Sequence, residues 1–186
     1  MRMLVASALL VMAASWTAPS FTHRRHARAQ QRTSTVTCGA VATFCKRRFS
    51  ISEALSQKTE AKLKHRAEYI DGTMTARICN KLQSRLGLSE AQLQKVVVAQ
   101  PQVLGYSFES NIAPKLNFLQ RELDLSLTAL RECVLARPSL LGYSQDRRFA
   151  QRLEACRLAG ADPMLIIGRV AMSDARFYSS IGLEPP

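Results

Sequence analysis

The feature that most constrains the fold of this chain is a seven-residue pattern that occurs twice. Pro-x-x-Leu-Gly-Tyr-Ser occupies residues 101–107 and returns at residues 138–144. Around these two copies, the segments that begin at Leu88 and Leu125 align without a gap at an offset of 37 residues. A small domain seldom duplicates a catalytic motif, whereas a stacked structural unit has to recur at a fixed period. The sequence therefore predicts a helical repeat.

Each repeat reads as two helices joined by a tight corner. Ser89 and Ser126 stand just before helical patterns, where a serine side chain caps the free backbone N–H groups of a helix. Pro101 and Pro138 lack an N–H group and disfavour helical geometry in the residue before them, so the first helix of each repeat should end there. A short 3₁₀ turn should follow, and the glycine four residues after each proline allows the chain to reverse.

This unit resembles the repeat of the mTERF family, the mitochondrial transcription termination factor family and its plastid relatives. The family repeat is a helix, a Pro-x-Leu-Leu-type corner, a second helix and a 3₁₀ turn. Residues 86–123 and 125–160 fit it, although Gln151 stands where the family often has proline. Residues 161–182 look like the closing half-repeat. The resemblance implies an all-α superhelix, a helical-repeat solenoid with short 3₁₀ corners, and it implies binding of nucleic acid in an organelle.

We expect three parts along the chain. Residues 1–51 should be a targeting leader that is mostly disordered, residues 52–87 an N-terminal helical cap, and residues 88–182 two full mTERF-like repeats with a C-terminal half-repeat. The cap segment reads as two helices that are separated by the turn signal Asp71-Gly72.

The leader combines two kinds of targeting signal. Residues 4–14 form an uncharged apolar run after Arg2 and before small residues, which is the layout of a secretory signal and is too short to cross a membrane. The following stretch is rich in Ser, Thr and Arg, and residues 1–52 contain eight basic and no acidic residues. The order resembles the bipartite leaders of algae with secondary plastids. We expect a plastid protein with no membrane segment in its mature form; a mitochondrial protein or an ordinary secreted one is the alternative.

Basic residues in the repeats are the candidates for nucleic-acid contacts. The family resemblance implies recognition of the phosphate backbone of double-stranded DNA or structured RNA. Lys115 and Arg152 are equivalent positions of the two repeats, whereas Lys95 is not a candidate because its equivalent is Glu132. The predicted contacts are made by Lys115, Arg137, Arg147, Arg148 and Arg152.

The sequence favours regulation or termination of organellar transcription, or RNA maturation, as the function. The alternative is a helical-repeat scaffold that binds proteins such as organellar polymerase or ribosome components. Catalysis is not expected, because no His/Cys/Asp cluster and no Gly-rich phosphate loop is present. The five cysteines have no metal-ligand spacing, so we expect no metal and no cofactor.

Overall fold

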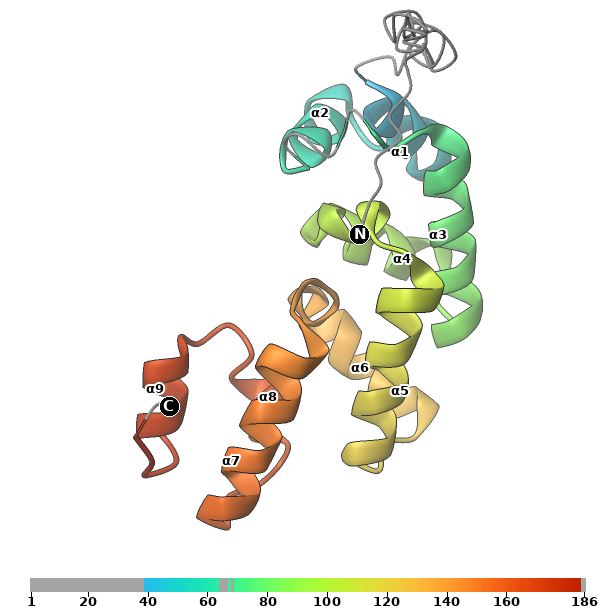
Figure 1. The fold of residues 1–186 in the computed structure, drawn as a ribbon. Coiled ribbons are helices and arrows are strands. Elements are labelled where there is room, and N and C mark those ends of the chain that lie inside the picture. The colour runs from blue at the N-terminus through green and yellow to red at the C-terminus, as the bar shows by residue number, and fades with distance from the viewer. Residues whose placement is uncertain (1–38, 64–66, 68, 185–186) are drawn as a thin grey trace, which may run out of the picture. The chain divides into compact units, whose positions relative to one another are not determined.

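The fold is known from a computed structural model that describes residues 39–63, 67 and 69–184 (Figure 1). The chain divides into two compact units, Met1–Thr35 and Val36–Pro186, and the described residues belong to the second. The expected targeting signals in residues 1–38 therefore lie outside the described part. Among the described helices, none combines the length and the apolar character that a membrane crossing requires.

The described part of the chain contains helices and no strands, which confirms the expected all-α repeat fold. The α-helices follow one another as α1 (Ala40–Phe49), α2 (Glu53–Ala61), α3 (Gly72–Leu86), α4 (Glu90–Ala99), α5 (Ala113–Glu122), α6 (Leu127–Ala136), α7 (Gln151–Ala159), α8 (Leu165–Gly168) and α9 (Asp174–Ser179). The first helices of the repeats pack in order, α2 against α4 and α4 against α6.

The two corners have the same structure. A 3₁₀ turn runs over Pro101–Gly105 in one repeat and over Pro138–Gly142 in the other. Each turn starts at its proline and buries two apolar residues completely, which are Val103 and Leu104 in the first corner and Leu140 and Leu141 in the second. Serine caps begin the first helices as expected, and Ser89 forms a full capping box with Gln92. The proline and serine positions thus set the helix ends.

One feature of the second helices was not expected. Each of them opens with a π-helical turn, Phe108–Ile112 before α5 and Gln145–Ala150 before α7. The Ile112 N–H donates to the Ser107 carbonyl, five residues back. A π turn holds one residue more than an α turn, and its weak sequence signature explains why periodicity did not show it.

The 37-residue period also runs through the N-terminal helices. Ser50, Gly87 and Asp124 are spaced at this interval, and all three have left-handed backbone geometry at the end of α1, α3 and α5. Arg85 donates to Asn117 and Gln120, and Arg48 donates to Asn80 and Gln83, each residue one period earlier. The segment expected as a cap, 52–87, therefore holds two helices, α2 and α3, in the order of the first and second helices of the two later repeats.

Helix α1 lies inside the range that we expected for the leader. It buries Val41, Cys45 and Phe49, and it packs against α2 and α3. The Gly39 N–H donates to the Glu60 carboxylate at 2.9 Å, and Arg48 forms an ion pair with Glu90 at 2.7 Å. Helix α1 is thus a second helix of the same row as α3, α5 and α7.

The cysteines are part of the apolar core. Cys45, Cys79 and Cys156 are buried, Cys133 is half-buried, and none of the four forms a disulfide. Burial raises the pKa of the Cys45 thiol to about 11 and that of the Cys79 thiol to about 12. These thiols are therefore protonated and unreactive at neutral pH. Across residues 39–63, 67 and 69–184, no group of three His, Cys, Asp or Glu residues could hold a metal ion.

Candidate nucleic-acid interface

Lys115, one of the predicted contacts, is buried in the fold. Its side chain is 2% exposed, and its Nζ donates to the Leu141 carbonyl at 2.7 Å and to the Asn111 side chain at 3.2 Å. Burial lowers the pKa of its ammonium group to about 8. Since Leu141 belongs to the corner of the following repeat, Lys115 ties two repeats together. This corrects the prediction, because a phosphate on the surface cannot reach the ammonium group.

Arg152, its equivalent in the next repeat, has the same role. Its side chain is 1% exposed, and its guanidinium donates to the carbonyls of Arg169 and Met172 at 2.9 and 2.6 Å. It also pairs with Asp174 at 2.7 Å and lies 4.4 Å from the centre of the Phe177 ring. The prediction of a phosphate contact is corrected here too, because all of these donors are used within the protein.

Arg148 is intermediate between a structural and a surface cation. It donates to the Met172 carbonyl at 2.8 Å, pairs with Asp174 at 3.1 Å and stacks on Tyr143 at 4.8 Å from the ring centre. The two remaining predicted residues, Arg137 and Arg147, are exposed and form no hydrogen bond or ion pair through their side chains with other described residues. Of the five, these two can present a free charge to nucleic acid.

A basic groove lies between α2 and α4. It is lined by Leu55, Lys58, Thr59 and Lys62 on one side and by Ala91, Gln94, Lys95, Val98 and Ala99 on the other, and its volume is about 580 Å³. Three of the nine lining residues are lysines and none is acidic, so the groove has an uncompensated positive charge. We call it the α2/α4 groove.

The three lysines are available to a ligand. All three are exposed, and neither Lys58 nor Lys95 has a side-chain hydrogen bond or ion pair with the rest of the described chain. Among the described residues, Lys62 donates only to the Val98 carbonyl at 3.1 Å, while Gln102 donates to the Lys62 backbone carbonyl at 3.2 Å and fixes its position. An ammonium group on a flexible stem is well suited to contact phosphate as a point charge.

A sequence signal for this groove existed and was overlooked. Lys58 precedes Lys95 by one period of 37 residues, so the two lysines are equivalent positions of consecutive repeats. One period later the equivalent of Lys95 is Glu132, which hides the pair as long as residues 52–87 are expected to be a cap. Extending the period toward the N-terminus would have shown the pair.

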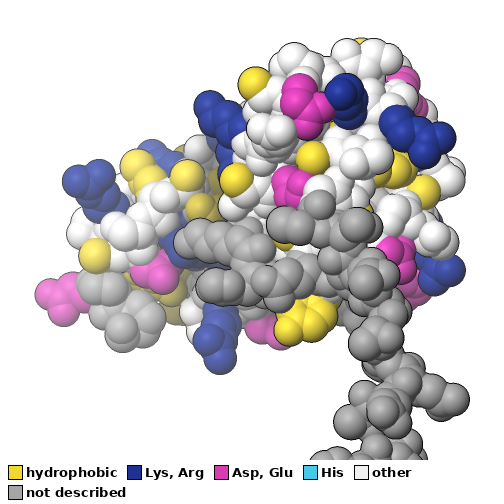
Figure 2. Space-filling model, turned by 90° about the horizontal axis from the view of Figure 1, so that it is seen from above, with side chains coloured by type: hydrophobic (Ala, Val, Ile, Leu, Met, Phe, Trp, Pro, Cys, Tyr) yellow, Lys and Arg dark blue, Asp and Glu magenta, His cyan; other side chains and the backbone are white. Residues whose placement is uncertain are grey.

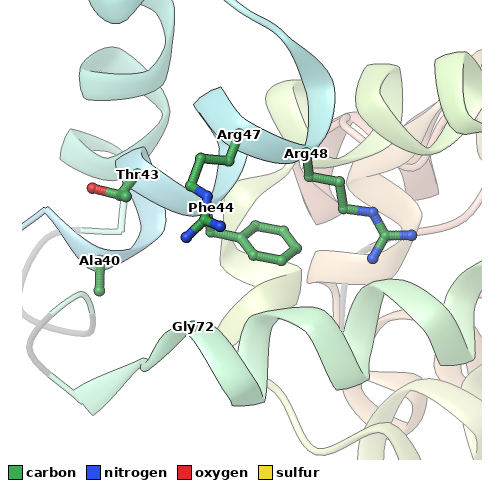
Figure 3. Close-up of a pocket in the computed structure, with 6 residues that line it drawn as sticks. All are labelled: Ala40, Thr43, Phe44, Arg47, Arg48 and Gly72. Carbon is green, nitrogen blue, oxygen red and sulfur yellow. The ribbon is translucent and has the colours of Figure 1, made fainter.

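Elsewhere many charges compensate each other. On the face drawn in Figure 2, Lys and Arg side chains are interspersed with Asp and Glu. Lys46 pairs with Glu53, Lys81 with Glu109, and Arg121 and Arg157 both pair with Glu122. A smaller groove between α1 and α3 carries the exposed Arg47 beside Thr43 and Phe44, opposite Gly72 at the start of α3 (Figure 3). Its other cation, Arg48, is already paired with Glu90.

Comparison with known proteins agrees with the repeat architecture. The mTERF family model matches residues 63–178, which begins before α3 and ends in α9. No curated protein and no solved structure matches the chain. The match spans more than half of the chain and covers the two full repeats, so the chain belongs to the mTERF family.

Proposed function

We propose that this protein binds the phosphate backbone of nucleic acid through the α2/α4 groove, as part of the machinery of organelle gene expression. The observation that carries the proposal is the recurrence of Lys58 and Lys95 at equivalent repeat positions, with Lys62 in the same groove and no acid among its lining residues. Membership of the mTERF family supports a nucleic-acid-binding protein related to organellar transcription.

The chemistry of the groove suits a polyanion better than a particular base sequence. Lysines on successive repeats place positive charges at a regular interval, and phosphates recur regularly along a strand. Arg137 and Arg147 add two free cations outside the groove. The residues that remain in the proposed interface are therefore Lys58, Lys62, Lys95, Arg137 and Arg147. Double-stranded DNA or structured RNA is the proposed ligand.

Regulation or termination of transcription, or RNA maturation, is the process that we propose for this binding. The bipartite composition of the leader favours a plastid, with a mitochondrion as the alternative. We also propose that the mature protein begins at or before Gly39. Cleavage farther along the chain would remove part or all of α1, which covers α3 and holds Glu90 through Arg48.

The test compares two triple variants of the full chain that lose the same charge. The groove variant, Lys58→Ala/Lys62→Ala/Lys95→Ala, lacks the three lysines of the groove. The control variant, Arg47→Ala/Arg77→Ala/Arg176→Ala, lacks three exposed arginines outside it that have no ion pair with another described residue. Binding of a fluorescent 20-base-pair duplex would be titrated between roughly 0.05 and 0.3 M salt. Each lost phosphate contact should lower the slope of log K against log salt by about 0.9, so the groove variant should lose about 2.7 and bind about 500-fold more weakly at 0.1 M salt.

The arginine variant should stay within about threefold of the unmodified chain, since its charges lie outside the groove. The leader is present in all three proteins and contributes equally to each. Arg137→Ala measures the outlying contact and should lower the slope by about 0.9. Equal losses in the two triple variants would show that only the net charge matters, and they would refute the groove as the binding site.

A further inference from the structure

A second groove, of opposite character, lies at the C-terminal end of the row of second helices. Its lining residues are Ala150, Gln151, Glu154, Ala155, Leu158, Tyr178, Leu183 and Glu184, and its volume is about 580 Å³. The floor is apolar, both charged residues are acidic, and no Lys or Arg lines it. We call it the C-terminal groove.

Leu158 is the feature that sets this groove apart. Its side chain is 75% exposed on α7, the largest exposure of any leucine in the described part of the chain. The equivalent positions one, two and three periods earlier are Arg121, Ser84 and Arg47, all polar. A repeat position that is polar in each earlier repeat and apolar only in the last indicates a local requirement, since a solvated helix surface would be satisfied by serine or arginine.

The grooves between α1 and α3 and between α3 and α5 are lined by cations. In the groove between α3 and α5, Lys81 from α3 forms an ion pair across to Glu109, and Arg85 lines the wall. The groove between α1 and α3 is lined by Arg47 and Arg48. Between described residues no ion pair spans the C-terminal groove, where Ala155 takes the position of Lys81. This groove therefore has an open apolar floor.

We propose that the C-terminal groove binds a basic amphipathic helix of a protein partner. Leu158, Ala155 and Leu183 would receive the apolar side chains of such a helix, which recur every three to four residues. Lys or Arg residues at the edges of that helix would pair with Glu154 and Glu184. Glu154 is free to do so, because its pairing with Arg157 is an exposed i,i+3 contact at 3.7 Å, a weak type of interaction.

Charge complementarity selects this partner over a nucleic acid. Two carboxylates beside an apolar floor repel phosphate and attract a cationic peptide. The groove lies on the row of second helices, whereas the three lysines lie between first helices. The proposal is thus independent of the nucleic-acid function, and it allows one chain to hold a strand and a protein at once.

The experiment uses synthetic probes and the full-length chain. The first probe is a fluorescently labelled, helix-forming peptide of 18 residues that consists of Leu and Lys, with leucines at positions i, i+3, i+4 and i+7. The control probe has the same leucines, but Glu replaces each Lys, so that its charge is negative. Anisotropy should show binding of the Leu/Lys peptide and at least tenfold weaker binding of the Leu/Glu peptide. Leu158→Ser, which installs the residue found at the equivalent Ser84, should weaken binding of the Leu/Lys peptide at least tenfold.

Matched variants decide whether the groove is responsible. Leu127→Ser replaces another exposed leucine, on α6 outside this groove, and should leave the affinity for the Leu/Lys peptide unchanged. Glu154→Gln/Glu184→Gln should weaken it and reduce its dependence on salt. Equal loss in the two leucine variants would overturn the proposal, as would equal binding of both peptides. Light scattering that shows self-association abolished by Leu158→Ser would also overturn it, because a second copy would then be the occupant.

Discussion

The α2/α4 groove and the groove between α6 and α8 are equivalent sites two repeats apart, but only the first is basic. Four residues line the α2 side of the first groove, and the residues 74 positions later line the second groove. Leu55, Lys58, Thr59 and Lys62 correspond in this way to Ala129, Glu132, Cys133 and Ala136. Arg137 is the single cation that lines the α6/α8 groove. The repeat thus fixes the backbone and the buried positions, while each exposed position is free to carry its own chemistry.

The buried cations of the same repeats show the opposite behaviour. Lys115 and Arg152 are equivalent positions, and both keep a positive charge that is bound to carbonyl groups of the following unit. Recurrence of charge at equivalent positions therefore has two possible causes. The charge can bind a ligand, as we propose for Lys58 and Lys95, or it can form hydrogen bonds that hold consecutive repeats together.

The largest expected effect is on stability, and it comes from removing one of these buried cations. Arg152→Met should lower the free energy of unfolding by about 3 kcal/mol, because the carbonyls of Arg169 and Met172 each lose a hydrogen bond from a charged donor. Urea denaturation measures the change, and Arg176→Met, an exposed control, should stay within about 0.5 kcal/mol of the unmodified chain. Unchanged stability of Arg152→Met would argue that this arginine is free for a ligand after all.

A smaller effect should follow from making the two grooves alike. Glu132→Lys/Ala136→Lys gives the α6/α8 groove the lysines of its counterpart. If these grooves bind phosphate, the slope of log K against log salt should steepen by about 1.8, and duplex affinity should rise about 10- to 100-fold at 0.1 M salt. Asp146→Lys/Ser179→Lys adds the same charge at exposed positions outside both grooves. A gain of similar size in this control would mean that groove geometry contributes nothing.

The smallest effect on binding is expected for the buried lysine. Lys115→Met should leave the salt dependence of duplex binding unchanged, because the ammonium group is covered. It should alter the pH dependence of stability. The pKa of Lys115 falls from 10.5 to about 8 on folding, so above about pH 8 the unfolded chain binds more protons and the free energy of unfolding rises up to about pH 10.5.

That rise should be smaller in Lys115→Met, since the variant lacks the titrating group. The difference between the two proteins, measured by urea denaturation from pH 7 to pH 10.5, removes the contributions of the groups that both share. Identical pH profiles would indicate that Lys115 titrates normally. A weaker salt dependence of binding in the variant would place this lysine back among the ligand contacts.

The fold could be predicted where the cause is local. Pro101 and Pro138 end helices through their missing N–H groups, and Ser89 and Ser126 begin them through their hydroxyl groups, regardless of the rest of the chain. The sequence did not predict a repeat over residues 52–87, because Lys64 and not proline stands one period before Pro101. Without proline and glycine a corner has no signature in the sequence, although α2 and α3 follow each other as the two helices of a repeat do.

The sequence by itself determined the repeat, its corners and the family of this protein, because helix caps, prolines and apolar spacing act over a few residues. Only the tertiary structure decided which positive charges face solvent. Lys115 and Lys95 both stand on helices of the repeats, yet one reaches a carbonyl of the next corner and the other lines an open groove. A lysine side chain is long enough to do either, and its environment depends on the element packed against its helix, which the local sequence does not specify.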